Sequence, residues 1–166
     1  MRRRTRPPVD VHAGEKVLAW AESSSGPVVA GTRDALYIVG PGVPGETRLP
    51  WEQVKSADWD REDSRLRISE VGSWGEELVV HTLEIDEPGL LLELVRERVT
   101  ASVVLQRHVP LDGRRGVRVV ARRAPRGDRP IAWFYEYDEG VDPDDADVRA
   151  AAEAALAAAR DEVGPT

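Results

Sequence analysis

The stretch "ELVVHTLEIDEPGLLLELVRERVTAS", residues 77–102, changes its hydrophobic period halfway along. From Val79 to Ile85 every second residue falls on one face, which is the pattern of a β-strand. After Pro88, which suits the first turn of a helix, apolar residues recur every three or four positions. These residues are Leu91, Leu94, Val95 and Val99. The stretch therefore predicts a strand and then an amphipathic helix, whose apolar stripe lies against the preceding sheet.

Short strands separated by turns fill the chain before this stretch. The candidate strands are "KVLAWAES" (16–23), "VVAGT" (28–32), "ALYIVG" (35–40), "TRLPWEQVKSADW" (47–59), "RLRISEV" (65–71) and "ELVVHTLEI" (77–85). A hairpin is expected around Arg33 and Asp34, and Pro50 indicates an edge position or a bulge. In the fifth segment Leu66 and Ile68 share one face. Strands this short and regularly spaced predict a small antiparallel sandwich or barrel.

Strand patterns resume after the helix and predict a three-stranded meander. The segments are "SVVLQRHVPL" (102–111), "VRVVARR" (117–123) and "IAWFYEY" (131–137). An alanine-rich helix, "DADVRAAAEAALAAARDEVG" (145–164), follows them. The expected fold class is therefore α+β: a small antiparallel sandwich or barrel closed by a helix, then the meander and the C-terminal helix.

Seven acidic residues crowd the stretch "IAWFYEYDEGVDPDDAD", residues 131–147. We interpret them as a strand end and a helix start, with Asp142 as the N-cap and Pro143 at the first helical position. Asp144 and Asp145 then lie at the positive end of the helix dipole. A calcium loop needs a glycine at its sixth position and a glutamate at its twelfth. Counted from Asp138, neither requirement is met, so the pattern favours capping over cation binding.

Residues 14–101 resemble the pleckstrin-homology-like family, in particular its small bacterial and GRAM-type members. The resemblance is carried by "GEKVLAW", "VVAGTRDALYIV", "RLPWEQVKSADW", "RLRIS", "ELVVHTLEI" and "PGLLLELVRERV". Its details are a Gly-Glu pair before the first strand, Thr32 ahead of Leu36 and Tyr37, and a Leu-Pro-aromatic pattern from Leu49 to Val54. It implies a bent antiparallel sandwich closed by a helix. Lipid-binding members carry basic residues in the first loop, but here that loop is "SSSGP", so phosphoinositide binding is not implied.

The organisation expected from these patterns is a flexible basic tail at 1–12, a PH-like domain at 13–101 and an extension at 102–166 packed on it as one compact unit. The chain of 166 residues has no cysteine, which excludes disulfides, thiolate metal sites and a thiol nucleophile. The basic start is not followed by the apolar segment of a signal peptide, and "GLLLELV" (89–95) is too short to cross a bilayer. We therefore expect a soluble, cytoplasmic protein.

An arginine-rich run at 107–129 contains eight arginines, although the net charge of the chain is −7. The candidate binding residues are Arg114, Arg115, Arg118, Arg122, Arg123 and Trp133. Arginines there would contact phosphates while an aromatic side chain stacks on bases. The alternative is that the arginines pair with neighbouring acids such as Glu136 and Asp138, and the negative net charge favours this second interpretation.

No motif in the sequence indicates catalysis, a cofactor or a metal. Asp58 and Asp60 flank Trp59 and would share one strand face, which could suit acid/base work, but a solvated strand face is the favoured interpretation. His81 shares a strand face with Val79, Leu83 and Ile85 and is expected to be a hydrogen-bonded core residue rather than a ligand. We therefore expect a non-catalytic binding or scaffold protein with another protein as its partner. Nucleic-acid or anionic-surface binding, an enzyme with carboxylates such as Glu136, and self-association through sheet edges remain as alternatives.

Overall fold

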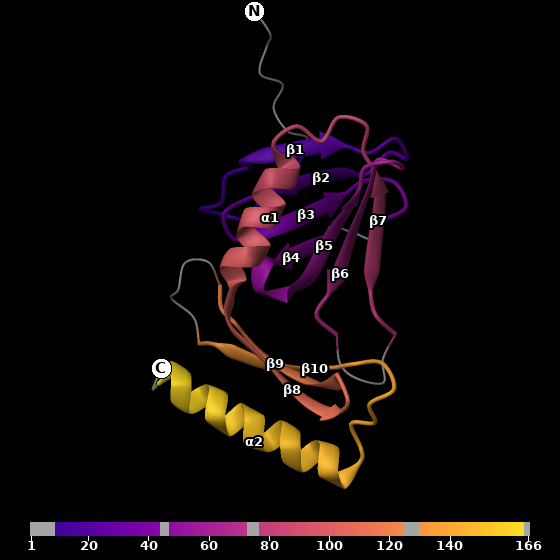
Figure 1. Cartoon of the computed structure of the whole chain (residues 1–166). Coiled ribbons are helices and arrows are strands. Elements are labelled where there is room, and N and C mark those ends of the chain that lie inside the picture. The colour runs from indigo at the N-terminus through magenta and orange to yellow at the C-terminus, as the bar shows by residue number, and fades with distance from the viewer. Residues whose placement is uncertain (1–8, 44–46, 73–76, 125–129, 165–166) are drawn as a thin grey trace, which may run out of the picture. The chain divides into compact units, whose positions relative to one another are not determined.

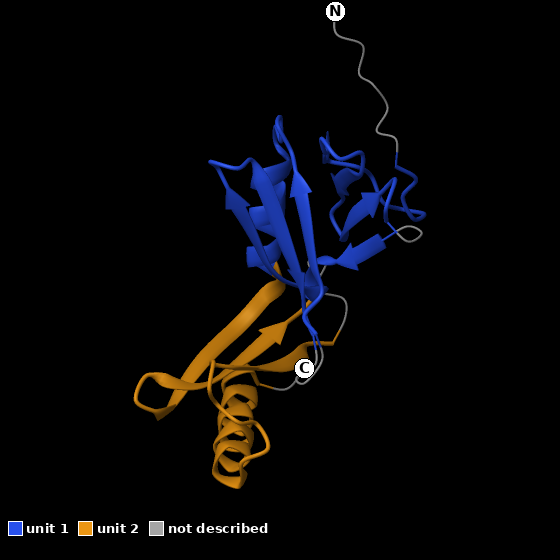
Figure 2. Ribbon diagram, turned by 90° about the vertical axis from the view of Figure 1, so that its right-hand side faces the viewer, with its two compact units in different colours: residues 1–101 blue, residues 102–166 orange. Residues whose placement is uncertain are grey.

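The computed structural model describes residues 9–43, 47–72, 77–124 and 130–164. Within these ranges the chain is an α+β protein with three antiparallel sheets and two α-helices (Figure 1). It divides into two compact units, residues 1–101 and 102–166 (Figure 2). Neither of the two described α-helices has the length and apolar character that a membrane crossing needs.

Unit 1, residues 1–101, contains two sheets and one α-helix. The first sheet has four strands in the order β1 (Ala19–Glu22), β2 (Val28–Gly31), β3 (Ala35–Val39) and β4 (Thr47–Pro50). The second has three strands, β5 (Val54–Asp60), β6 (Arg65–Glu70) and β7 (Val80–Glu84), also in chain order. Helix α1 (Leu91–Ser102) follows the last of these strands, which confirms the strand-to-helix change predicted at this point.

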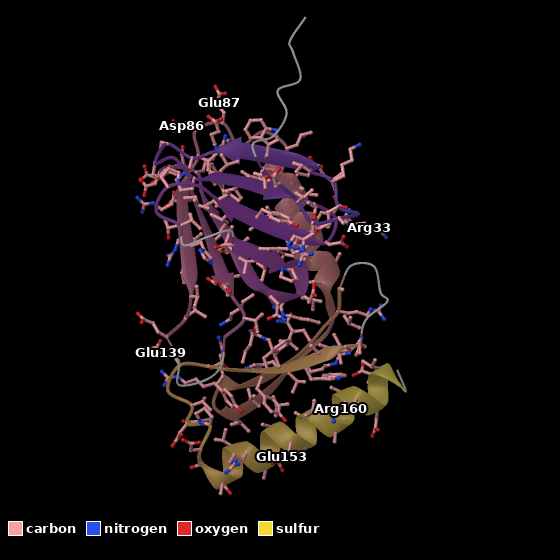
Figure 3. The ribbon with its side chains drawn as sticks, turned by 180° about the vertical axis from the view of Figure 1, so that it is seen from behind. Arg33, Asp86, Glu87, Glu139, Glu153 and Arg160 are labelled. Atoms are coloured by element: carbon pink, nitrogen blue, oxygen red, sulfur yellow. The ribbon has the colours of Figure 1, made fainter. Side chains whose placement is uncertain are left out.

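The predicted hairpin around Arg33 and Asp34 is confirmed. Strands β2 and β3 pair antiparallel, and Thr32 closes the turn between them. The Thr32 amide donates to the Ala35 carbonyl over 2.9 Å, while its Oγ1 accepts from the Asp34 and Ala35 amides, each at 3.1 Å. Figure 3 shows Arg33 at this turn. The hydroxyl of one side chain thus satisfies amides that the tight turn leaves without a strand partner.

The sequence suggested one interrupted strand over residues 47–59, but the structure differs. This segment forms β4, a single 3-10 turn (η1, Trp51–Gln53) and then β5, and the two strands belong to different sheets. Pro50 ends β4 with a φ of −53°, and proline has no amide to continue a strand ladder. The expected edge position is confirmed, because β4 is an edge strand of its sheet. The turn that follows places Trp51 in the interior, so Pro50 marks a corner between sheets rather than a bulge within one.

The core of unit 1 is shared by both sheets and α1. Trp51 is fully buried at its centre, and its Nε1 donates to the Thr32 carbonyl over 2.9 Å. Helix α1 contributes Leu91 and Val95, which confirms the predicted apolar stripe. Leu94 of the same stripe lies against Gly31, where a Cβ would come within 2.6 Å of Leu94 Cδ2. The core residues are Ala21, Val29, Leu36, Ile38, Leu49, Trp51, Val54, Leu66, Ile68, Leu83, Ile85, Leu91 and Val95.

The opposite face of the four-stranded sheet is covered by the segment that precedes β1. Val9 is 8% exposed and packs with Ala30 and Tyr37, and Val11 lies against the same cluster. Of the segment expected to be a flexible tail, residues 9–12 lie against this sheet face, while residues 1–8 lie outside the described ranges. The alternation of Val9 and Val11 is the pattern of an extended segment with one buried face, which the flanking prolines and charges obscure.

Unit 2, residues 102–166, contains the predicted meander and helix. Strands β8 (Val103–Asp112), β9 (Arg115–Arg122) and β10 (Ala132–Tyr137) form one sheet with β9 in the centre. Helix α2 (Ala146–Val163) lies along this sheet and contacts β8 and β9 (Figure 1). Its Ala152 and Ala159 are buried. Small side chains at these positions let the helix approach the sheet closely.

Helix α2 begins three residues later than predicted. Asp145 is the N-cap, and its side chain accepts from the amides of Asp147 and Val148 at 2.8 Å and 3.3 Å. Asp142 instead closes a turn ahead of the helix, because its Oδ1 accepts from the Asp144 amide over 2.9 Å. Both aspartates satisfy the local rules for capping, so the sequence alone does not choose between them.

The two aspartates are expected to differ in their effect on stability. Asp145→Ala should lower the free energy of unfolding by about 1 kcal/mol, the usual effect of losing an N-cap. Asp142→Ala should have less than half that effect, because Asp142 accepts a single turn amide outside the helix. Thermal unfolding followed by circular dichroism measures both. Equal effects, or a larger effect at Asp142, would contradict the observed helix start.

Candidate functional site

A groove lies between the edge strand β5 and helix α1 within unit 1. Its volume is about 540 Å³. The residues that line it are Ala57, Asp58, Trp59, Leu66, Leu92, Glu93, Val95 and Arg96. Among the described residues, β6 is the only strand that pairs with β5, so β5 is an edge strand of its sheet. The groove thus combines a sheet edge with the side of a helix.

Alternation along β5 gives the groove its apolar floor. Trp59 pairs with Leu66, and Ala57 pairs with Ile68, two residues of the buried core. Because paired residues share a face of the sheet, Ala57 and Trp59 point inward, and both pack partly buried against the core. Asp58, exposed between them, points to the opposite face of the sheet. The floor therefore remains apolar although every second residue is polar.

Helix α1 supplies the other wall. Leu92 is half-buried and packs against the same core as Trp59, while Val95 is buried. Glu93 and Arg96 are exposed and contribute charge at the rim of the groove. An apolar floor with charged groups at the edge is the usual composition of a site that receives a peptide or a small molecule.

Asp58 and Asp60, the carboxylate pair considered from the sequence, have other neighbours in the structure. Asp58 lies opposite Arg67 on β6, and Asp60 lies opposite Arg65. Asp60 Oδ1 also accepts from the amides of Glu62 and Asp63 at 3.0 Å and 3.1 Å, which closes the β5–β6 turn. The structure therefore gives Asp60 a structural role in the hairpin.

The predicted arginine-rich site is only partly brought together. Arg118 Nη1 and Arg122 Nη2 lie 3.7 Å and 3.9 Å from the two carboxylate oxygens of Glu136. Arg122 Nη1 also lies 3.4 Å from Ser102 Oγ. Ion pairing with Glu136 matches the interpretation that these arginines are matched by neighbouring acids. Arg114 and Arg115 at the β8–β9 turn and Arg123 after β9 are exposed.

Trp133 lies on the other face of this sheet. It pairs with Ala121, whereas Arg118 and Arg122 pair with Glu136 and Ala132, so their side chains point the opposite way. The Arg160 guanidinium of α2 lies over the Trp133 ring, 5.9 Å from its centroid. The combination of phosphate contacts from Arg118 and Arg122 with base stacking on Trp133 is therefore not available on one surface of the sheet.

Two of the three histidines, His81 and His108, pair with acids. His81 Nε2 lies 2.7 Å from Glu70 Oε2, so it is hydrogen-bonded to the neighbouring strand. His108 Nε2 lies 2.8 Å from Asp138 Oδ2, which also accepts from the Gly116 amide over 2.8 Å. The hydrogen bond from His108, and then that from Gly116, lower the pKa of Asp138. Within the described ranges no three His, Asp or Glu side chains gather closely enough to hold a metal ion.

A buried carboxylate that the sequence analysis did not single out lies on the covered face of the four-stranded sheet. The Glu15 side chain is 4% exposed and accepts from Tyr37 Oη at 2.6 Å and from Thr32 Oγ1 at 2.7 Å. Arg48 reaches the same carboxylate, with Nε and Nη2 each 3.2 Å from Oε2. The His12 amide donates to Tyr37 Oη over 3.1 Å. We call Glu15, Thr32, Tyr37 and Arg48 the Glu15 cluster.

The Glu15 cluster favours the charged carboxylate. Burial alone would raise the pKa of Glu15, but hydrogen bonds from Tyr37 and Thr32 and the charge of Arg48 outweigh it, so the pKa lies below its ordinary value. Burial and the adjacent carboxylate raise the pKa of Tyr37, which therefore keeps its proton and donates it. The available signal was the Gly-Glu pair ahead of the first strand, together with Thr32 and Tyr37, but their proximity depends on strand pairing.

The chain was compared with protein-family models, with curated proteins and with solved structures, and none of the three comparisons found a match.

Proposed function

We propose that this chain is a non-catalytic protein-binding module of the pleckstrin-homology-like type, which receives an extended segment of a partner protein along β5. The observation that carries the proposal is the groove of about 540 Å³ between an edge strand and α1. An extended peptide can add to such an edge as a further strand, using main-chain hydrogen bonds for affinity and side-chain pockets for specificity.

The order of the elements supports the family part of the proposal. Four strands, then three strands, then one helix share a single core, as the resemblance of residues 14–101 implies. The residues that carry the resemblance also have a physical role. Glu15, Thr32 and Tyr37 are joined by hydrogen bonds of 2.6–2.7 Å, and Trp51 bonds to Thr32. These residues act as a framework of unit 1 and do not line the groove.

The composition of the groove supports a polypeptide as the ligand. Trp59 and Leu92 offer apolar contact area to alternate side chains of an added strand, while Glu93 and Arg96 are placed to contact polar groups. Aromatic residues are enriched at the centres of protein interfaces. Nucleic-acid binding through the arginine-rich run receives less support, because Glu136 pairs with both Arg118 and Arg122.

Selection from a random-peptide display library, using the full chain as bait, tests the proposal. Leu92→Glu should weaken binding of the selected peptides at least about ten-fold, because it places a charge in an apolar groove. Leu90→Glu is the matched control, since Leu90 is 71% exposed and does not line the groove. Both variants are first compared by thermal unfolding, so that a loss of binding is not confused with a loss of fold.

The mode of binding has its own readout. N-methylation of alternate peptide amides should abolish binding in one set of positions and leave it unchanged in the other, because only every second amide of an added strand faces the sheet edge. Failure to select any peptide, or equal binding by the Leu92→Glu variant, would contradict the proposal. The nucleic-acid alternative predicts a different result. The chain would be retained on DNA in a salt-sensitive manner, and the double variant Arg118→Ala, Arg122→Ala would lose this retention.

A further inference from the structure

Residues 9–17, which we call the N-terminal strap, cover one face of the four-stranded sheet. The apolar residues beneath and around it are Ala30, Ala35 and Tyr37, with Trp20, Val28 and Val39 at their margins. Ala30, Ala35 and Tyr37 are completely shielded from solvent. The opposite face of the same sheet packs into the core of unit 1, so the strap covers a second apolar surface of the sheet.

The strap is attached to the sheet differently from a strand. Among the described residues, no backbone-to-backbone hydrogen bond joins residues 9–17 to the sheet; the first such bond is from the Leu18 amide to the Gly31 carbonyl, over 2.8 Å. The His12 amide donates to a side chain, Tyr37 Oη, and the Glu15 amide donates within the strap to the His12 carbonyl. The strap therefore lacks the ladder that holds each neighbouring strand to the next.

Glu15 provides the polar attachment that the ladder would otherwise supply. Gly14 has a φ of +86°, and the turn from His12 to Glu15 that it permits directs the Glu15 side chain toward the sheet. The carboxylate then bonds to Thr32 after β2, Tyr37 on β3 and Arg48 on β4. One buried charge thus connects the strap to three successive positions across the sheet, and such charge-assisted bonds are the strong ones.

We propose that the N-terminal strap is a releasable cover, held closed by the Glu15 carboxylate, whose opening uncovers the apolar sheet face around Ala30 and Tyr37. A segment with few backbone bonds to its neighbours opens locally at a lower free energy than the whole domain. The strap meets that description, while the strands beneath it are fixed by pairing to one another. The charge on Glu15 therefore sets how often the cover opens.

Amide hydrogen exchange measured by NMR on the full chain tests the proposal, comparing wild type with Glu15→Gln. Glutamine keeps the size of the side chain but removes the charge that pairs with Arg48. Exchange of the His12 amide should become at least about ten-fold faster, because the weaker attachment of residue 15 lets the strap open more often. The acceptor of this amide, Tyr37 Oη, is still present in the variant, so the faster exchange reports opening of the strap. The Leu18 amide should keep its wild-type rate, because it bonds to β2 beyond the strap.

Glu22→Gln on β1 is the matched control, because Glu22 is exposed and lies outside the strap; it should leave the His12 rate unchanged. Arg48→Met, at a position 27% exposed on an edge strand, provides a second test if Glu15→Gln does not fold. It should accelerate His12 exchange less than Glu15→Gln does, because Tyr37 and Thr32 still bond to Glu15. An unchanged His12 rate, or acceleration of Leu18 and the core amides to the same degree, would overturn the proposal.

Discussion

Trp51→Ala is expected to lower the free energy of unfolding of unit 1 by about 3–5 kcal/mol, the range found when a large aromatic side chain is removed from a core. Trp51 is completely buried between the two sheets and α1. Its removal also leaves the Thr32 carbonyl without the indole Nε1 donor at 2.9 Å, which adds the cost of an unsatisfied buried acceptor. The cavity cannot close easily, because backbone pairing fixes the surrounding strands.

Urea unfolding followed by far-ultraviolet circular dichroism measures this effect. Trp59→Ala is the control, since Trp59 is only partly buried and lines the groove rather than the centre of the core. It should cost less than half as much as Trp51→Ala. A loss below about 1 kcal/mol for Trp51→Ala, the size of an ordinary surface or boundary change, would show that this indole does not organise the core.

Gly116→Ala is expected to have the largest effect in unit 2, at more than about 3 kcal/mol, because it overpacks a site made of backbone. A Cβ at Gly116 would lie 1.9 Å from the Val109 carbonyl oxygen and 2.8 Å from Pro110 Cα on the neighbouring strand β8. Neither atom can rotate away, so β8 and β9 must separate locally. The hydrogen bond from the Gly116 amide to Asp138 would be strained at the same place.

Gly113→Ala, in the turn of the same hairpin, separates crowding from backbone conformation. Gly113 has a φ of +61° and no atom within 4 Å of its Cβ position, so alanine there meets only the conformational penalty of about 1–2 kcal/mol. Thermal unfolding of the two variants by circular dichroism gives the comparison. If the Gly113 variant were the less stable of the two, the close approach of β8 to Gly116 would be refuted.

Local sequence patterns were sufficient to predict the helices, strands and turns that are determined by neighbouring residues in the chain. The alternation of Leu66 and Ile68 predicted β6, and the helical spacing of Leu91 and Val95 predicted α1; all four side chains are buried as expected. The hairpin at Arg33 and Asp34 was equally clear. Each of these signals lies within a short segment of the chain and depends on local spacing or turn residues. Tertiary contacts did not change the secondary structure that these local patterns favour.

The features that the sequence did not predict depend on residues distant in the chain. Pro50 signalled an interruption, but only the burial of Trp51 shows that the chain changes sheets there. Glu15 resembles any charged residue near a terminus until β3 and β4 bring Tyr37 and Arg48 beside it. The groove likewise arises from β5 and α1, which are separated in sequence by two strands, so no local pattern marks Trp59 and Leu92 as neighbours.

The recess at Gly31 has a consequence for the dimensions of the groove between β5 and α1. Leu94 occupies the space that a side chain at position 31 would fill. This close contact therefore helps to fix the position of α1 on the sheet. Leu92, two residues before Leu94, is on the wall of the groove. A larger residue 31 would first displace the Leu94 side chain, and a shift of α1 that followed would alter the spacing between Leu92 and β5. The width of the groove that we propose to receive a peptide would then change through a residue that does not line it.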